Sequence, residues 1–113
     1  MTTQVYAERH LHHHVGDAFT YEVVVYDSDG TVRDISNDVL RAQFNFDTSV
    51  VLTTGSGITK TDATSGVFTW TLSKTQSAVS AGNYTYGVKL ETSSGDEYTI
   101  VWGTLELLDQ VVD

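Results

Sequence analysis

The most unusual run of residues in this 113-residue chain is a histidine-rich segment near its N-terminus, from Glu8 to His14. Its alternate histidines are His10, His12 and His14, which share one face of an extended strand at a spacing of about 6.6 to 7 Å. Two imidazoles at this spacing can share a zinc or nickel ion. We favour an interface or a solvated edge strand, because few histidine clusters have complete first and second ligand shells. Influence of a cloned tag is a further alternative.

A second group of candidate ligands surrounds one turn. Its side chains carry the hard oxygen atoms that suit calcium, and they are Asp27, Asp29, Asp34, Asn37 and Asp38. The spacing does not match a helix-loop-helix calcium site, because Gly30 follows too soon and no glutamate closes the loop. We therefore expect these carboxylates to cap backbone N–H groups in turns.

The sequence shows no catalytic arrangement. Ser56 lies between glycines and Ser65 precedes one, but neither forms a Gly-x-Ser-x-Gly elbow. The absence of cysteine excludes a thiol nucleophile, a disulfide and a Cys-ligated zinc site. Carboxylates fall at predicted turns or outward strand positions, where nothing suggests a desolvated pocket that would raise a pKa. We expect a non-enzymatic protein with no cofactor.

Aromatic residues are the remaining candidates for binding, since exposed rings can stack on sugars. Most of them, including Trp70, alternate in phase with aliphatic neighbours, which favours packing in a core. Trp102 is the exception, because a bulge next to Gly103 would turn its ring outward. We therefore group Trp102 with His10, His12 and His14 as expected interface residues.

The charge balance limits the classes of partner. Six Lys and Arg residues against 15 Asp and Glu residues give a formal net charge of −9, and such a surface repels phosphate backbones and anionic lipid. No apolar run approaches the roughly 18 residues that a membrane-spanning helix needs. Neither nucleic acid nor a membrane is an expected partner. The N-terminus also lacks the order of a secretion signal.

The elements that must position these residues are strands. Strict alternation is clearest from Val39 to Asp47, where Leu40, Ala42, Phe44 and Phe46 share the predicted inward face. Turn sequences separate the expected strands, which cover residues 18–26, 31–34, 39–47, 50–53, 58–61, 67–72, 83–92 and 97–108. The last two should pair through the turn at residues 93–96. The only helical signal is a capping box from Ser73 to Gln76.

These features predict an all-β protein with about seven to nine strands and at most one short helical turn. The turn spacing is typical of an antiparallel β-sandwich or a small barrel. The length accommodates one domain, which we place at residues 15–113. Residues 1–14 precede it as an arm or edge strand, and we expect this arm to lie against another protein chain.

The segment from Ser80 to Tyr86 resembles the entry to strand F of an immunoglobulin-type sandwich. By this resemblance Gly82 precedes a tyrosine corner at Tyr84, whose buried ring should bond an upstream backbone group. Tyr86 stands where the disulfide cysteine of antibody domains would be. The resemblance therefore implies structural roles for Gly82, Tyr84, Tyr86 and Trp70 in an immunoglobulin-like sandwich.

A second resemblance covers nearly the whole chain and depends on the order of its motifs. An opening Gly-Asp, the phrase Asp-Gly-x-x-x-Asp-Ile, a Gly-x-Tyr-x-Tyr strand and a Gly-bearing last strand occur in succession. They lie at Gly16–Phe19, Asp27–Ile35, Ala81–Val88 and Val101–Leu105, with Ser65–Ser73 between them. This order is similar to that of small immunoglobulin-like proteins encoded among the tail and baseplate genes of tailed bacteriophages and prophages.

The phage resemblance implies a virion structural protein assembled in the host cytoplasm. Its expected partners are other virion proteins and copies of itself, in the tail, neck, baseplate or capsid exterior. The alternative is a carbohydrate-binding or host-surface-binding module with the same fold.

Overall fold

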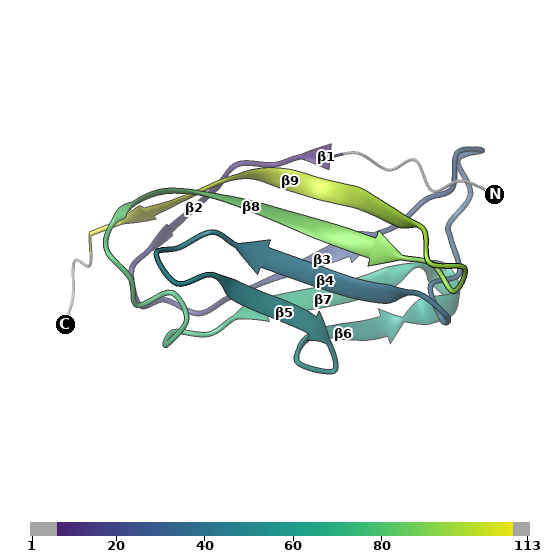
Figure 1. Cartoon of the computed structure of the whole chain (residues 1–113), viewed down its shortest axis with the longest axis horizontal. Coiled ribbons are helices and arrows are strands. Elements are labelled where there is room, and N and C mark those ends of the chain that lie inside the picture. Colours follow the sequence, from purple (N-terminus) through teal and green to yellow (C-terminus); the bar gives the residue numbers. More distant parts are fainter. Residues whose placement is uncertain (1–6, 110–113) are drawn as a thin grey trace.

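The computed structural model of the protein describes residues 7–109, which form two β layers packed face to face (Figure 1). The strands are β1 (Ala7–Glu8), β2 (Leu11–His14), β3 (Phe19–Val24), β4 (Val39–Phe44), β5 (Val50–Thr54), β6 (Gly57–Asp62), β7 (Val67–Leu72), β8 (Gly82–Glu91) and β9 (Glu97–Leu108). A 3-10 helix, η1, spans Ala63–Ser65. No helix among residues 7–109 is long and apolar enough to cross a membrane.

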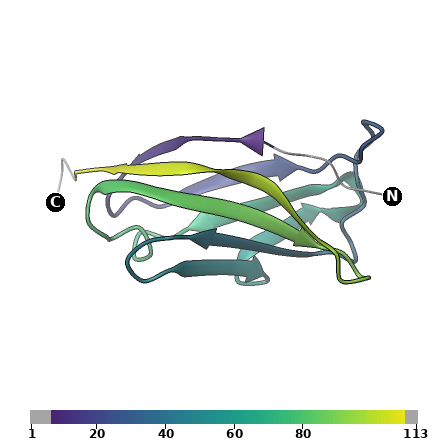
Figure 2. The same cartoon turned by 45° about the horizontal axis from the view of Figure 1, so that its top comes forward.

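Strand pairing defines the two layers. One layer runs in the order β1/β2, β9, β8, β4, β5, and the other contains β6, β7 and β3. Figure 2 shows β9, β8, β4 and β5 in front of the second layer. Only two residue pairs join β5 to β6, where the chain passes between the layers. Because β1 and β2 both pair with β9 in parallel, they act as one interrupted strand.

This strand order is that of an immunoglobulin-like sandwich. The pairing of β3, β7 and β6 matches strands B, E and D, and that of β9, β8, β4 and β5 matches G, F, C and C′. The predicted all-β fold class is confirmed.

Alternating burial in β4 produces the core that holds the layers together. Leu40, Ala42, Phe44 and Phe46 are buried, whereas the residues between them are exposed. The predicted register of this strand is confirmed. Val25, Trp70 and Tyr86 belong to the same hydrophobic cluster, with Val23 partly buried against it.

A β-bulge in β9 changes which side chains face the core. Val88 is paired with Val101 but Lys89 is paired with Thr99, so Ile100 is the extra residue. Ile100 and Val101 are consequently both buried, and Trp102 faces outward with 37% of its surface exposed. The outward ring was expected, although the bulge lies before Trp102 rather than at Gly103.

Two expected local elements differ in the structure. Residues 31–34 form no strand beyond one bridge between Tyr26 and Val32. Backbone bonds from Asp27 N–H to the Thr31 carbonyl oxygen and from Arg33 N–H to the Val25 carbonyl oxygen flank this bridge, and the pairing extends no further. The capping box does form, since Ser73 N–H donates to Gln76 Oε1 at 2.9 Å and Gln76 N–H donates to Ser73 Oγ at 3.1 Å. It supports a single turn that is not assigned as a helix.

The one helix within residues 7–109 is η1, which the sequence analysis did not predict. It ends at Gly66, whose φ of 74° lies in the left-handed region. A Cβ there would lie 2.6 Å from the Arg33 carbonyl oxygen, so the loop that contains Arg33 packs directly on this glycine. This contact joins segments that are far apart in the sequence, so no local sequence motif predicts it.

Tyr84 occupies the corner before the long hairpin. Its hydroxyl donates to the Ser80 carbonyl oxygen at 2.5 Å, and its ring meets Phe46 edge to face at a centroid distance of 4.9 Å. The expected bond to an upstream backbone group is present. The expectation of full burial was wrong: Tyr84 is half-buried, because the corner lies at the end of the core.

We predict that Tyr84→Phe lowers the free energy of unfolding by about 1 kcal/mol, the usual net contribution of one hydrogen bond. Chemical denaturation measures this change. The matched control is Tyr98→Phe, because Tyr98 also packs partly buried against the core and its hydroxyl has no hydrogen bond within residues 7–109. Equal stability of the two variants would remove the structural role assigned to the corner.

Candidate functional site

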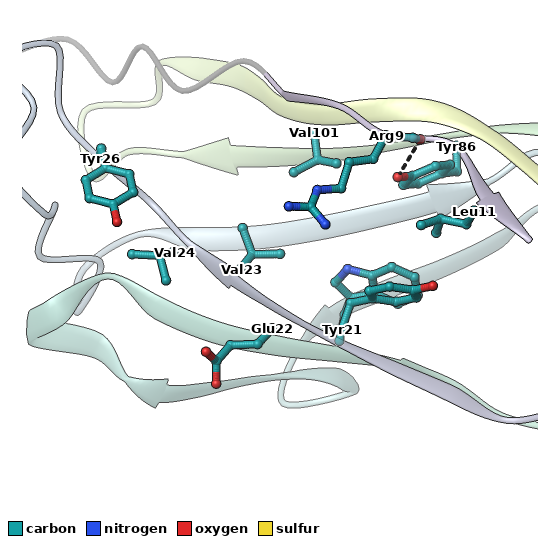
Figure 3. A pocket seen from close by; sticks show the side chains of 10 residues that line it. Arg9, Leu11, Tyr21, Glu22, Val23, Val24, Tyr26, Tyr86 and Val101 are labelled. Atoms are coloured by element: carbon teal, nitrogen blue, oxygen red, sulfur yellow. Dashed lines mark hydrogen bonds between the residues drawn. The ribbon is translucent and has the colours of Figure 1, made fainter.

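A groove opens between the N-terminal edge strand and β3, where the two layers face each other (Figure 3). Its volume is about 320 Å³. The walls are mainly apolar and aromatic, and the lining residues are Arg9, Leu11, Tyr21, Glu22, Val23, Val24, Tyr26, Trp70, Tyr86 and Val101. The groove exists because β1 and β2 pair with β9, while β3 pairs with β7, so the edges of the two layers stay apart.

The wall on the N-terminal side depends on a contact between Arg9, Tyr86 and Gly103. Tyr86 is paired with Gly103 across β8 and β9. Since Gly103 has no side chain, the Arg9 backbone occupies that space, and a Cβ on Gly103 would lie 1.8 Å from the Arg9 carbonyl oxygen. The Tyr86 hydroxyl donates to this same oxygen at 3.0 Å. Gly103 therefore permits the close approach of the Arg9 backbone.

Burial keeps the Tyr86 hydroxyl protonated as a donor. It raises the pKa of Tyr86 to about 12, and the positive charge of Arg9 opposes this rise. Burial also raises the pKa of Tyr21, again against the effect of Arg9. Both phenols therefore remain neutral at physiological pH, and the groove contains hydroxyl groups rather than phenolates.

Arg9 gives the groove a positive charge. Figure 3 shows its guanidinium group reaching over the groove between Val23 and Val101. The group forms no ion pair with a carboxylate of residues 7–109. Glu22 also belongs to the lining, but in Figure 3 its side chain is directed away from the guanidinium. The groove is thus apolar with one available cation.

The structure gives His10 and His12 separate partners. His12 Nδ1 lies 2.8 Å from Glu106 Oε1, and the Thr104 N–H donates to His10 Nδ1 at 3.2 Å. His14 ends β2 beside Leu108. Within the described part of the chain, no three His, Asp or Glu side chains are close enough to hold a metal ion. The zinc or nickel alternative for His10, His12 and His14 therefore has no support in this geometry.

His13 is the histidine that joins the two layers, although no spacing in the sequence distinguishes it from its neighbours. Its ring stacks on Phe19 at 3.8 Å with an interplanar angle of 1°, and its Nε2 lies 2.7 Å from the Tyr21 hydroxyl oxygen. Burial lowers the pKa of His13; Asp17 acts in the opposite direction, and His12 and His14 lower it further. The neutral imidazole is the form that this packing favours.

The acidic turn is organised by Arg33 rather than by a metal. Arg33 donates to both carboxylate oxygens of Asp38, at 2.8 and 3.1 Å, and to Asp27 Oδ1 at 3.3 Å. Asp27 and Asp38 are buried. Asp29 and Asp34 instead accept hydrogen bonds from the backbone and hydroxyl groups of Thr31 and Ser36, as expected for turn residues.

The expectation that these side chains cap backbone N–H groups in turns was wrong for two of the five residues, Asp27 and Asp38. Asp27 and Asp38 do not cap turns through their carboxylates; they neutralise a nearly buried guanidinium. The sequence hid the role of Arg33 because its partners lie six residues before it and five residues after it in one irregular loop, and no strand period predicts such a contact.

The other expected structural residues lie at the core. Trp70 is 2% exposed and stacks on Tyr21 at 5.1 Å, so it forms the base of the groove. Gly82 begins β8, and a Cβ there would lie 3.8 Å from the Tyr84 hydroxyl oxygen. Trp102 lies on the opposite face of the first layer from the groove. His12 and His14 are paired with Glu106 and Leu108, which project from the same face of β9 as Trp102, so these expected interface residues follow one outer face.

Comparison with known proteins identifies no family. No family model matches the chain, and no curated protein matches it. Among solved structures, that of murine CRIg is similar over 96% of this chain and 95% of its own, with 8% sequence identity and a TM-score of 0.37. This similarity is too low to carry an argument, and the fold assignment rests on the strand pairing described above.

We predict that Arg33→Leu lowers the free energy of unfolding by about 3 kcal/mol or more, because it leaves two buried carboxylates unpaired. Denaturant titration measures the loss. Arg41→Leu is the matched control, since its ion pair with Glu97 is about half exposed on both sides and should contribute less than about 1 kcal/mol. Equal losses in the two variants would contradict a structural role for the Arg33 cluster.

We predict that His13 makes folding sensitive to mild acid. Its folded pKa lies below the unfolded value, so the unfolded chain binds the proton more readily, and stability falls as pH decreases through about 6.5. His13→Gln should reduce this fall, as measured by the free energy of unfolding at about pH 7 and pH 5. The other three histidines are common to both proteins, so parallel pH curves would contradict burial of a neutral His13.

Proposed function

We propose that the protein is a non-enzymatic structural component of a bacteriophage virion that assembles through contacts with other virion proteins and copies of itself. The order of sequence motifs shared with small tail and baseplate proteins supports the virion setting. The open edge of β3 beside the groove supports the mode of assembly, and this observation carries the proposal.

The β3 edge offers a site for strand addition. Within residues 7–109, β3 pairs with β7 and with no other strand. An edge strand presents free N–H and C=O groups to which an extended segment can add. The adjacent groove would receive alternate side chains of such a segment, so that the backbone supplies affinity and the groove supplies specificity.

The N-terminal segment was expected to dock on another chain, and its position in the structure changes the docking site that we propose. Within the expected arm of residues 1–14, β1 and β2 already pair with β9 of their own chain, and residues 1–6 lie outside the described part of the chain. We accordingly assign docking to the groove between this strand and β3 rather than to a free arm. The net charge of −9 supports this assembly mode, because it favours a soluble free subunit.

The test is incorporation into particles. Val24→Glu places a carboxylate in the groove, next to the open edge, at a half-buried position that tolerates a larger side chain better than the core. We expect this variant to fold with a melting temperature close to that of the parent protein and to be missing from purified particles, as judged by mass spectrometry.

Val39→Glu is the matched control, because Val39 is 54% exposed and lies outside the groove. It should be incorporated at the parental level. Normal incorporation of Val24→Glu would contradict docking at the groove. Absence of the parent protein from purified particles would contradict the virion assignment itself.

A further inference from the structure

A second hollow lies on the outer face of the five-stranded layer, on the opposite side of this layer from the core. Its volume is about 310 Å³, and it lies over β4, β8 and β9, the strands that face forward in Figure 2. Polar and positively charged side chains dominate its lining, which consists of Arg41, Gln43, Asn45, Tyr86, Gly87, Lys89 and Thr99. The proposed assembly at the groove does not use this face.

Gly87 creates the floor of this hollow without being required by the fold. Its φ is not among the positive values found at other glycines, and an added Cβ would lie 3.6 Å from the Val101 carbonyl oxygen, an ordinary contact. Gly103, in contrast, is required because the Arg9 backbone occupies its side-chain space. Glycine weakens the interior of a strand and often marks a bulge or the close approach of a ligand or another backbone. The bulge in β9 lies one residue pair beyond Gly87, and the space over Gly87 on the outer face is open to a ligand.

The strand register surrounds Gly87 with groups that can bind a sugar. Gln43 lies opposite it on β4, and Trp102 lies opposite it on β9. Thr85 and Lys89 are two residues away along β8 and therefore project from the same face. Of these neighbours, Gln43 and Lys89 line the hollow with an amide and an ammonium group, whereas Thr85 and Trp102 lie beside it on the same face.

The amide groups of this face are already oriented by one another. Gln43 Nε2 donates to Asn45 Oδ1 at 3.0 Å, and Asn45 Nδ2 donates to Thr85 Oγ1 at 2.8 Å. This chain of bonds leaves Gln43 Oε1 without a donor among the described residues. It is therefore a fixed acceptor for a ligand hydroxyl group.

Positive charge is concentrated at one end of the hollow. Arg41 and Lys89 lie directly opposite each other on β4 and β8, an arrangement of like charges that destabilises a sheet. Arg41 is partly compensated by Glu97 at 3.4 Å, and Glu91 lies at the same end of the sheet. Lys89 forms no ion pair with a carboxylate of residues 7–109, so an anionic ligand would relieve this repulsion.

We propose that the outer hollow binds a saccharide that carries a carboxylate. The pyranose ring lies over Gly87, next to Trp102, the neighbour of Gly87 on β9 that is 37% exposed at the margin of the hollow. One hydroxyl group donates to Gln43 Oε1, and the carboxylate accepts hydrogen bonds from Lys89. A neutral sugar makes the first two contacts but lacks the third, so the site discriminates in favour of an acidic sugar.

The test is a titration of the protein with glucuronate and with glucose, followed by amide and indole shifts in nuclear magnetic resonance spectra. We expect saturable shifts at Gly87, Gln43 and Trp102, with glucuronate bound more tightly than glucose. Lys89→Gln should weaken glucuronate about tenfold, as expected for loss of one charge-assisted bond, and leave glucose unchanged. Lys74→Gln, which removes a lysine from a distant turn, is the control and should bind both sugars like the parent protein.

Gly87→Val tests the hollow itself, because its side chain fills the floor at a position where the backbone accepts a Cβ. We expect a folded spectrum and loss of binding to both sugars. Three outcomes would overturn the proposal: no saturable shift with glucuronate, shifts that map outside the hollow, or unchanged binding by a folded Gly87→Val protein. None of these depends on assembly at the groove, so the virion proposal stands or fails separately.

Discussion

The contact of the Arg9 backbone with Gly103 and Tyr86 determines where the N-terminal strand lies, and the accessible surfaces follow from it. Gly103 leaves room for the Arg9 carbonyl group, and the Tyr86 hydroxyl supplies the donor that satisfies it. This contact lies where β1 ends and β2 has not begun, so it holds the interrupted strand on β9. Since the strand is held there, it does not cover β3, and the groove between the layers stays open.

The few positive charges of the protein have distinct environments. Six Lys and Arg residues oppose 15 Asp and Glu residues, so a cation without a carboxylate partner needs an explanation. Arg33 is nearly buried between Asp27 and Asp38, where it fixes a long loop. Arg9 lies over the groove and Lys89 lies on the outer face, and neither forms an ion pair within residues 7–109. The proposed docking and saccharide sites place ligands at these two cations.

The two proposed sites use opposite sides of the same layer. The groove is mainly apolar and opens along a strand edge, which suits an extended segment of protein. The outer hollow is polar, shallow and lined by strand side chains fixed in register, which suits a small hydrophilic ligand. The bulge at Ile100 separates the two, because it lets Val101 face the groove while Trp102 faces outward.

The sequence by itself determined the strands and their faces, because alternation is a local property of neighbouring residues. It was sufficient to predict the inward set of β4, the β8–β9 hairpin, the bond made by Tyr84 and the capping box at Ser73. The tertiary structure alone decided which strand the N-terminal segment joins, that His13 rather than its neighbours packs between layers, and that Arg33 binds two buried carboxylates. The tertiary structure also distinguished two glycines in neighbouring strands: the fold requires a glycine at position 103 but does not require one at position 87. The pairing with β9 and the contact at Gly103 join segments distant in the chain. The contacts of His13 and Arg33 span eight residues or fewer, but they depend on how the intervening turns fold, and strand alternation does not encode them.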